Sequence, residues 1–238
     1  MPRKLLRERN HPAVPTMPSV PAHRSDTGGL PTLAATDLAC RRGNRVLFTG
    51  VNFSLDAGQA IWLRGRNGRG KTSLLRLAAG LASPESGTVC WGGVPVRQAA
   101  GLAPSLVYVA HASALKDDLT VTESLRFLAL LHGRPSDAAS VSEALDRVGM
   151  ASRRDAPVRT LSQGQRRRAT LARLALERDA SLWILDEPYD ALDTDGVDCI
   201  NVLLHANLAR GGSVLLTSHQ AVGASAPPMV PFDLDPFA

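Results

Sequence analysis

The stretch GRNGRGKTSLLRLAAGL, from Gly65 to Leu81, decides the fold. It opens with glycines and basic or polar residues and then becomes an apolar run with leucines at helical spacing. The short apolar segment Ala60–Leu63 precedes it and predicts a strand. A strand, a glycine-rich loop and a helix in this order form a unit whose backbone amides can surround a phosphate group.

The loop satisfies the pattern G-x-x-x-x-G-K-[ST] through Gly65, Gly70, Lys71 and Thr72. Glycines let the backbone curl, so that successive amide hydrogens point at phosphate oxygens. Lys71 would add a cation for the β- and γ-phosphates, and the Thr72 hydroxyl would coordinate Mg²⁺. We therefore expect a nucleotide triphosphate here, and the alternative is a connecting loop with a chance lysine. The remaining residues of the expected nucleotide-binding loop are Arg66, Asn67, Gly68 and Arg69.

A second motif is LWILDEP, from Leu182 to Pro188. Its four apolar residues predict a buried strand, and two carboxylates follow at the strand end. Asp186 would hold Mg²⁺, and Glu187 would orient or deprotonate an attacking water. Hydrolysis of a triphosphate depends mainly on positioning and charge stabilisation, so these two groups suffice. Alone, the pair would more often be a solvated strand end or a helix cap, but the upstream loop favours the hydrolytic interpretation.

A third motif, LSQGQRRRATLARL from Leu161 to Leu174, narrows the class of protein. Ser162, Gly164 and Gln165 fall where a helix should begin, and free amides and the helix dipole at such an end favour an anion. A serine N-cap before a basic amphipathic helix would explain this segment by itself. It would not explain why all three motifs occur together.

The three motifs, in this order, resemble the ATP-binding-cassette (ABC) ATPase family over about residues 32–222. The resemblance implies an α/β P-loop NTPase fold, with a mainly parallel sheet, flanking helices, an N-terminal antiparallel β part and a helical subdomain at about 112–165. It also implies that ATP and Mg²⁺ are bound and that ATP hydrolysis is coupled to transport.

The same resemblance implies a partner. In the family the third motif contacts the γ-phosphate bound to a second copy of the chain, in a head-to-tail dimer. The segment from Asp190 to Asp193 resembles the D-loop, which makes dimer contacts. His219, after a predicted strand, resembles the switch histidine that reaches the γ-phosphate. Glu187 and His219 are therefore the expected catalytic residues.

Three positions depart from the common family pattern. Gln163 stands where glycine is commonest. The aromatic residue that stacks on adenine should fall near Arg41 or Arg42, and neither is aromatic, although an arginine plane can also stack on a base. His111 stands where a glutamine usually contacts Mg²⁺, so it is a further candidate for a metal contact.

His111 opens a pattern, H-x-x-x-x-K-x-x-L-T, that runs to Thr120. The chain also contains S-G-x-V-x-W from Ser86, a G-Q-x-R-R run from Gly164, and G-G-x-V-L-x-T-x-H-Q from Gly211. These patterns are similar to those in the ATP-binding subunits of the haem exporter in cytochrome c maturation. The resemblance implies haem export for c-type cytochrome biogenesis, integral membrane subunits as partners, and a peripheral location at the cytoplasmic face of the inner (cell) membrane.

The composition argues against several other classes of protein. The 238 residues are 44% apolar and 21% charged, which fits one α/β domain with a real core. Aromatic residues are only 4%, which argues against base stacking on single-stranded nucleic acid, and no nucleic-acid partner is expected. The three cysteines are far apart and fit a reducing compartment without a zinc site. No apolar run is long enough to span a membrane.

The net charge is +5, and more than half of it lies in residues 1–30, which hold five basic and two acidic residues. We expect those residues to be a disordered, basic, proline-rich extension, residues 31–222 to be the ATP-binding domain, and residues 223–238 to be a proline-rich tail that is weakly structured at best. Strands are expected at Val46–Leu55, Ala60–Leu63, Ser86–Trp91, Leu106–Ala110, Ser181–Leu185 and Ser213–Thr217. Helices are expected at Thr72–Leu81, within Thr122–Gly149, and at Arg166–Leu176 and Gly196–Leu208.

Three alternatives stay open. The first is an ATPase of the same fold for another importer or exporter, since substrate identity resides in membrane subunits. The second is a soluble ABC protein associated with nucleic acid or ribosomes, which would usually carry two cassettes or long coiled-coil inserts. The third is a binding module without turnover, against which Glu187 and His219 argue.

Overall fold

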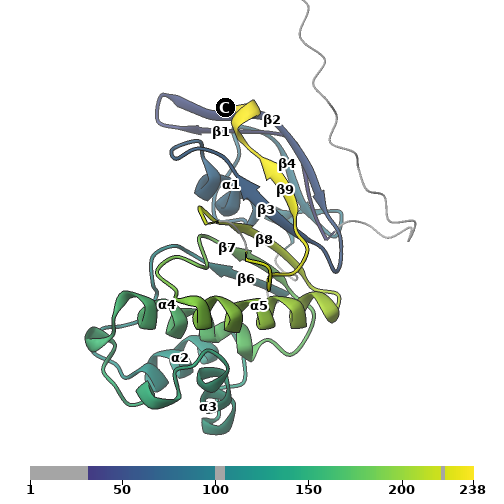
Figure 1. The fold of residues 1–238 in the computed structure, drawn as a ribbon. Coiled ribbons are helices and arrows are strands. Elements are labelled where there is room, and N and C mark those ends of the chain that lie inside the picture. Colours follow the sequence, from purple (N-terminus) through teal and green to yellow (C-terminus); the bar gives the residue numbers. More distant parts are fainter. Residues whose placement is uncertain (1–31, 100–104, 221–222) are drawn as a thin grey trace, which may run out of the picture.

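The computed structural model describes residues 32–99, 105–220 and 223–238, so the expected extension at 1–30 lies outside the described residues. The described part contains two sheets (Figure 1). The antiparallel sheet has the order β2-β1-β4-β5, from β1 (Leu33–Arg42), β2 (Arg45–Leu55), β4 (Ser86–Trp91) and β5 (Val94–Pro95). The parallel sheet has the order β6-β7-β8-β3-β9, from β3 (Ala60–Arg64), β6 (Leu106–Val109), β7 (Leu182–Leu185), β8 (Ser213–Thr217) and β9 (Val230–Asp233).

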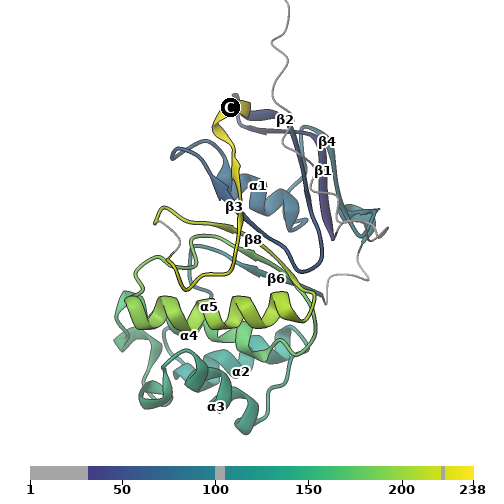
Figure 2. The same ribbon diagram turned by 45° about the vertical axis from the view of Figure 1, so that its right-hand side comes forward.

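Helices cover both faces of the parallel sheet. They are α1 (Lys71–Ala78), α2 (Val121–Leu131), α3 (Ala138–Arg147), α4 (Gln163–Leu171) and α5 (Thr194–Ala209). Figure 2 shows α1 between the two sheets, whereas α5 and the helical part formed by α2, α3 and α4 lie on the opposite side of the parallel sheet. The predicted fold class, with its parallel sheet, antiparallel β part and helices, is confirmed.

Strand β7 is apolar along its whole length because both of its faces are covered. Trp183 and Leu185 pack into the core that contains α2 to α5, whereas Leu182 and Ile184 pack into the core that contains α1 and the antiparallel sheet. All four side chains are buried. A parallel strand covered on both faces reads as a continuous apolar run, and this is the pattern that the motif presents before its carboxylates.

The helical part begins where the sequence places good caps. Thr120 caps α2 in a capping box with Glu123, and Asp137 caps α3 by accepting a hydrogen bond from the Ser140 amide. Helix α4 ends in a 3₁₀ segment, Ala172–Leu176, so the single helix expected at Arg166–Leu176 is divided. Both α2 and α3 lie within the span expected for the helical subdomain.

The expectation of a weakly structured C-terminal tail is wrong for its last residues. Strand β9 pairs in parallel with β3, and Phe232 and Leu234 are buried. The Phe232 ring lies 5.6 Å from the Phe53 ring and 5.8 Å from the Phe237 ring, between centroids. Pro231 misled the prediction because it stands in an outer strand, where a missing N–H is tolerated.

Strand β1 was also missed, for a different reason. Its register against β2 shifts between Ala35 and Leu38 and twice more before Arg42. Asp37, inside the strand, has a left-handed φ of 47°. These irregularities break the alternation of apolar and polar residues on which a strand prediction depends.

Candidate nucleotide-binding and hydrolysis site

The glycine-rich loop joins the end of β3 to the start of α1. Gly65, Gly68 and Gly70 have φ values of 139°, 78° and 99°, which side chains rarely adopt. The ammonium group of Lys71 donates hydrogen bonds to the carbonyl oxygens of Gly65, at 2.6 Å, and Arg66, at 3.3 Å. The loop therefore curls around the Lys71 side chain.

A cavity of about 610 Å³ opens beside this loop. Its lining joins the loop, α1 and the carboxyl ends of β6, β7 and β8. Ligands in parallel α/β sheets bind at this end of the strands. Of the predicted site residues, those that line the cavity are Asn67, Gly68, Gly70, Lys71, Thr72, His111, Asp186, Glu187 and His219.

The two carboxylates after β7 have different surroundings. Asp186 is 2% exposed, and its Oδ1 accepts a hydrogen bond of 3.0 Å from the hydroxyl of Thr217 at the end of β8. Glu187 has a left-handed φ of 52°, and its Oε2 accepts a 2.9 Å hydrogen bond from the backbone amide of His219. The His219 ring Nε2 lies 3.3 Å from Glu187 Oε1. The expected catalytic pair is thus in direct contact.

The surroundings of the Asp186 carboxylate fit a metal ion. Its Oδ2 is buried and has no hydrogen-bond partner within the described part of the chain. Thr72 and His111 line the same cavity. No group of three or more histidine, cysteine or acidic side chains gathers as a metal site among the described residues. A Mg²⁺ ion held by one carboxylate, a hydroxyl, phosphates and water fits this arrangement.

The structure separates the two arginines considered for adenine. Arg42 lines the cavity, whereas Arg41 makes a 3.3 Å ion pair with Glu85 outside it. Arg76 also lines the cavity, although no motif had indicated it. Its spacing of four residues from Thr72 along α1 was the available signal, since such residues share one helix face.

Two other residues of the predicted loop, Arg66 and Arg69, contact the C-terminal segment. Asp235, after β9, accepts a 2.9 Å hydrogen bond from the Arg66 amide. Its carboxylate also lies 3.6 Å from Arg66 Nε and 3.7 Å from Arg69 Nε. The C-terminal segment therefore braces the outer side of the glycine-rich loop, which no motif had indicated.

The third motif forms the start of α4, as expected. Ser162 is the N-cap, and its hydroxyl accepts a hydrogen bond from the Gln165 amide while the Gln165 side chain accepts one from the Ser162 amide. A Cβ on Gly164 would lie 2.5 Å from the carbonyl oxygen of Ala191, which explains the glycine. None of the three motif residues is among the described residues that line the cavity.

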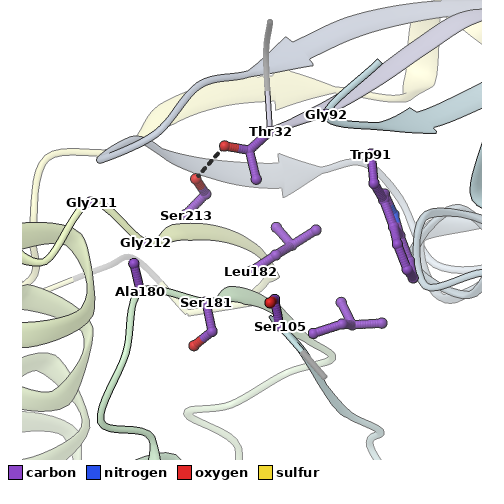
Figure 3. Close-up of a pocket in the computed structure, with 11 residues that line it drawn as sticks. Thr32, Trp91, Gly92, Ser105, Ala180, Ser181, Leu182, Gly211, Gly212 and Ser213 are labelled. Carbon is purple, nitrogen blue, oxygen red and sulfur yellow. Dashed lines mark hydrogen bonds between the residues drawn. The ribbon is translucent and has the colours of Figure 1, made fainter. Parts of the chain in front are cut away.

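A second cavity, of about 320 Å³, lies at the opposite ends of the parallel strands (Figure 3). Trp91, Leu182 and Ser213 are among the residues around it. Figure 3 shows the hydrogen bond between the hydroxyls of Ser213 and Thr32, which measures 3.3 Å. No residue of the three motifs except Leu182 lines this cavity among the described residues, so the candidate site is the larger one.

Comparison with known proteins agrees with this geometry. The family model described as "ABC transporter" matches residues 48–190. The chain is 45% identical over 194 residues to the "Cytochrome c biogenesis ATP-binding export protein CcmA" of Nitrosospira multiformis, a match that covers 81% of this chain and 94% of the relative. The chain belongs to the ABC transporter family. As a member of it, the protein is an ATP-binding subunit that hydrolyses ATP in support of transport.

Other relatives of this ABC protein carry the same name. The protein so named from Methylococcus capsulatus is 46% identical over 191 residues, which are 80% of this chain and 92% of the relative. Among solved structures, an ABC transporter ATP-binding protein from Pyrococcus furiosus has a TM-score of 0.74 at 22% identity, covering 87% of this chain and 98% of its own. An ATP-binding subunit of an ABC transporter has a TM-score of 0.69 at 24% identity, covering 79% of each chain. These two structures support the fold.

Within the described residues, the helices are too short or too polar to cross a membrane.

Proposed function

We propose that this ABC protein is the ATP-hydrolysing subunit of a membrane complex that exports or delivers haem for c-type cytochrome biogenesis. The contact between Glu187 and His219, beside the buried free oxygen of Asp186, is the observation that supports hydrolysis. The relatives named for cytochrome c biogenesis support the pathway. The runner-up is the same ATPase in a transporter of another substrate.

In this proposal the backbone amides from Gly65 to Thr72 and the Lys71 ammonium bind the phosphates of ATP. Asp186 and Thr72 would hold Mg²⁺, with His111 in the same cavity lining, and the ion would supply positive charge for the β- and γ-phosphates. Glu187 orients a water molecule and accepts its proton as the water oxygen bonds to the γ-phosphorus and the bond from that phosphorus to the bridging oxygen breaks, so that ADP leaves. His219 holds the Glu187 carboxylate through its backbone amide and its ring.

A second copy of the chain completes the site. Ser162, which is exposed, and the half-buried Gly164 and Gln165 stand at a helix start outside the cavity of their own chain. A helix N-terminus attracts an anion through free amides and the helix dipole. We infer a head-to-tail pair in which this end of α4 meets the γ-phosphate held by the other copy.

The membrane subunits dock on the helical part, through α2. Helix α2 exposes Phe127, Leu130 and Leu131 at 49%, 61% and 65% of their surfaces. Large apolar groups so exposed on neighbouring turns are typical of an interaction surface. The complex would hold the protein peripherally at the cytoplasmic face of the cell membrane, without nucleic acid as a partner.

The test is a pull-down of tagged Glu187→Gln protein from native membranes with ATP and Mg²⁺. Leu130→Ser should lose the membrane subunits, and Leu81→Ser, at a leucine that is 62% exposed after α1, should keep them. Recovery of small hydrophobic cytochrome c maturation subunits supports the pathway. Recovery of a different permease keeps the ATPase and discards the pathway, and recovery of ribosomes or nucleic acid alone overturns the proposal.

A further inference from the structure

Helix α4 carries a guanidinium group in the protein interior. Arg167 is 7% exposed, and burial lowers the pKa of its guanidinium. Arginine is almost never buried to this extent unless its donors are satisfied. The side chain stands one turn and a half after Ser162, so it belongs to the same helix start as the third motif.

The Arg167 donors meet the main-chain carbonyls of two neighbouring strand ends. Nη2 donates to the carbonyl oxygens of Asp186 and Glu187, both at 2.7 Å. Nη1 lies 3.0 Å from the carbonyl oxygen of Ala110 and 3.4 Å from that of His111. Asp186 and Glu187 follow β7, and Ala110 and His111 follow β6. One rigid fork therefore ties together the two loops that line the nucleotide cavity.

The two flanking arginines make different contacts. Arg166 donates to Asp117 Oδ1 at 2.6 Å, and the Asp117 side chain is 63% exposed. Arg168 forms an ion pair with Asp193, the N-cap of α5. Among these three consecutive arginines, Arg167 is the one whose described contacts reach the backbone of Asp186 and Glu187. A planar guanidinium carries donors on two separate nitrogens, and this suits carbonyl oxygens that lie on two different loops.

We propose that Arg167 is a positioning residue that couples the two ATP sites of a pair of chains. The proposal rests on the head-to-tail arrangement given above. In that pair the start of α4 contacts the nucleotide of the other copy. Arg167 joins the same helix to the backbone of Glu187 and His111 in its own site, so a shift of α4 also shifts that backbone. Hydrolysis in one site then depends on how α4 engages the other.

The test compares Arg167→Lys and Arg167→Gln with Arg166→Gln as the matched control on the same helix. Lysine keeps the charge and three donors, but these sit on one nitrogen and lack the planar fork with which Arg167 reaches carbonyls on both loops. We expect both Arg167 variants to bind ATP with a KM close to that of the wild type. Their kcat per folded molecule should fall about 10- to 100-fold, the effect of a misplacement of about 1 Å. Arg166→Gln should keep the wild-type kcat.

A second readout separates positioning from stability. Each Arg167 substitution is combined with Glu187→Gln, and ATP-dependent pairing is measured by sedimentation. Pairing should persist in Arg167→Lys, because the nucleotide and the start of α4 are unchanged. Folded fractions come from urea unfolding, and Arg167→Lys serves alone if Arg167→Gln does not fold.

The outcomes are distinct. Wild-type kcat per folded molecule in Arg167→Lys would overturn the coupling role and leave the ATPase proposal intact. A raised KM with unchanged kcat would overturn it as well. A wild-type protein that neither pairs with ATP nor hydrolyses it would overturn the proposed function and this inference together.

Discussion

Replacement of Gly164 by alanine tests the contact between α4 and the loop after β7. The new Cβ would lie 2.5 Å from the carbonyl oxygen of Ala191. Because carbon–oxygen contacts in proteins settle at about 3.3–3.6 Å, helix and loop would have to separate by roughly 1 Å. Ala191 has a left-handed φ of 60°, so its carbonyl is already fixed in an uncommon backbone conformation.

The magnitude follows from that overlap. Overpacking of one methyl group costs about 1–3 kcal/mol of unfolding free energy. A shift of this size at the start of α4 should lower turnover by about 100-fold. Urea unfolding followed by circular dichroism gives the first quantity, and steady-state phosphate release from ATP gives the second.

Gln163→Ala is the matched control, since Gln163 precedes Gly164 and is exposed. Its unfolding free energy should stay within about 0.5 kcal/mol of the wild type, and its turnover should be unchanged. If Gly164→Ala matched this control in both stability and turnover, the contact with Ala191 would not be the reason for the glycine.

Three further substitutions probe strand β9, the outer side of the glycine-rich loop and the buried carboxylate of Asp186. Phe232→Ala should lower the unfolding free energy by about 3–5 kcal/mol in urea, because the ring is buried between β9 and β2, and a loss below about 1 kcal/mol would argue that β9 is not part of the core. Asp235→Asn should tighten ATP binding by about two- to fivefold in calorimetry, since Arg66 and Arg69 lose a competing partly exposed charge, and weaker binding would contradict this. Asp186→Asn, or EDTA, should abolish phosphate release and leave a fluorescent ATP analogue bound, and full turnover without Mg²⁺ would refute the assignment of Asp186.

Much of the fold followed from local pattern. The strands β3, β4, β7 and β8 were predicted within a residue of their observed ends, because apolar runs between turn residues identify buried strands well. Strand β1 escaped because its irregular register removes the alternation, and β9 because its prolines resemble a tail. For β9 the partner strand β3 lies far away in the sequence, so its decisive contacts are not local, whereas β1 pairs with β2 directly after it and only its irregular register hid it.

The candidate site divides in the same way. Lys71, Asp186, Glu187 and His219 belong to motifs, and the structure brings them to one cavity. The braces around that cavity follow no such pattern. Arg167 binds main-chain carbonyls, which every residue has, so no partner residue type could have pointed to it.

The most direct test of the account is the size of Glu187→Gln protein by analytical ultracentrifugation. With ATP and Mg²⁺ it should sediment as a dimer, and without nucleotide as a monomer, because hydrolysis is blocked while both copies still bind the γ-phosphate. Lys71→Ala added to this variant should leave a monomer under both conditions. A Glu187→Gln protein that stays monomeric while saturated with ATP would contradict the central claim that two copies share each nucleotide.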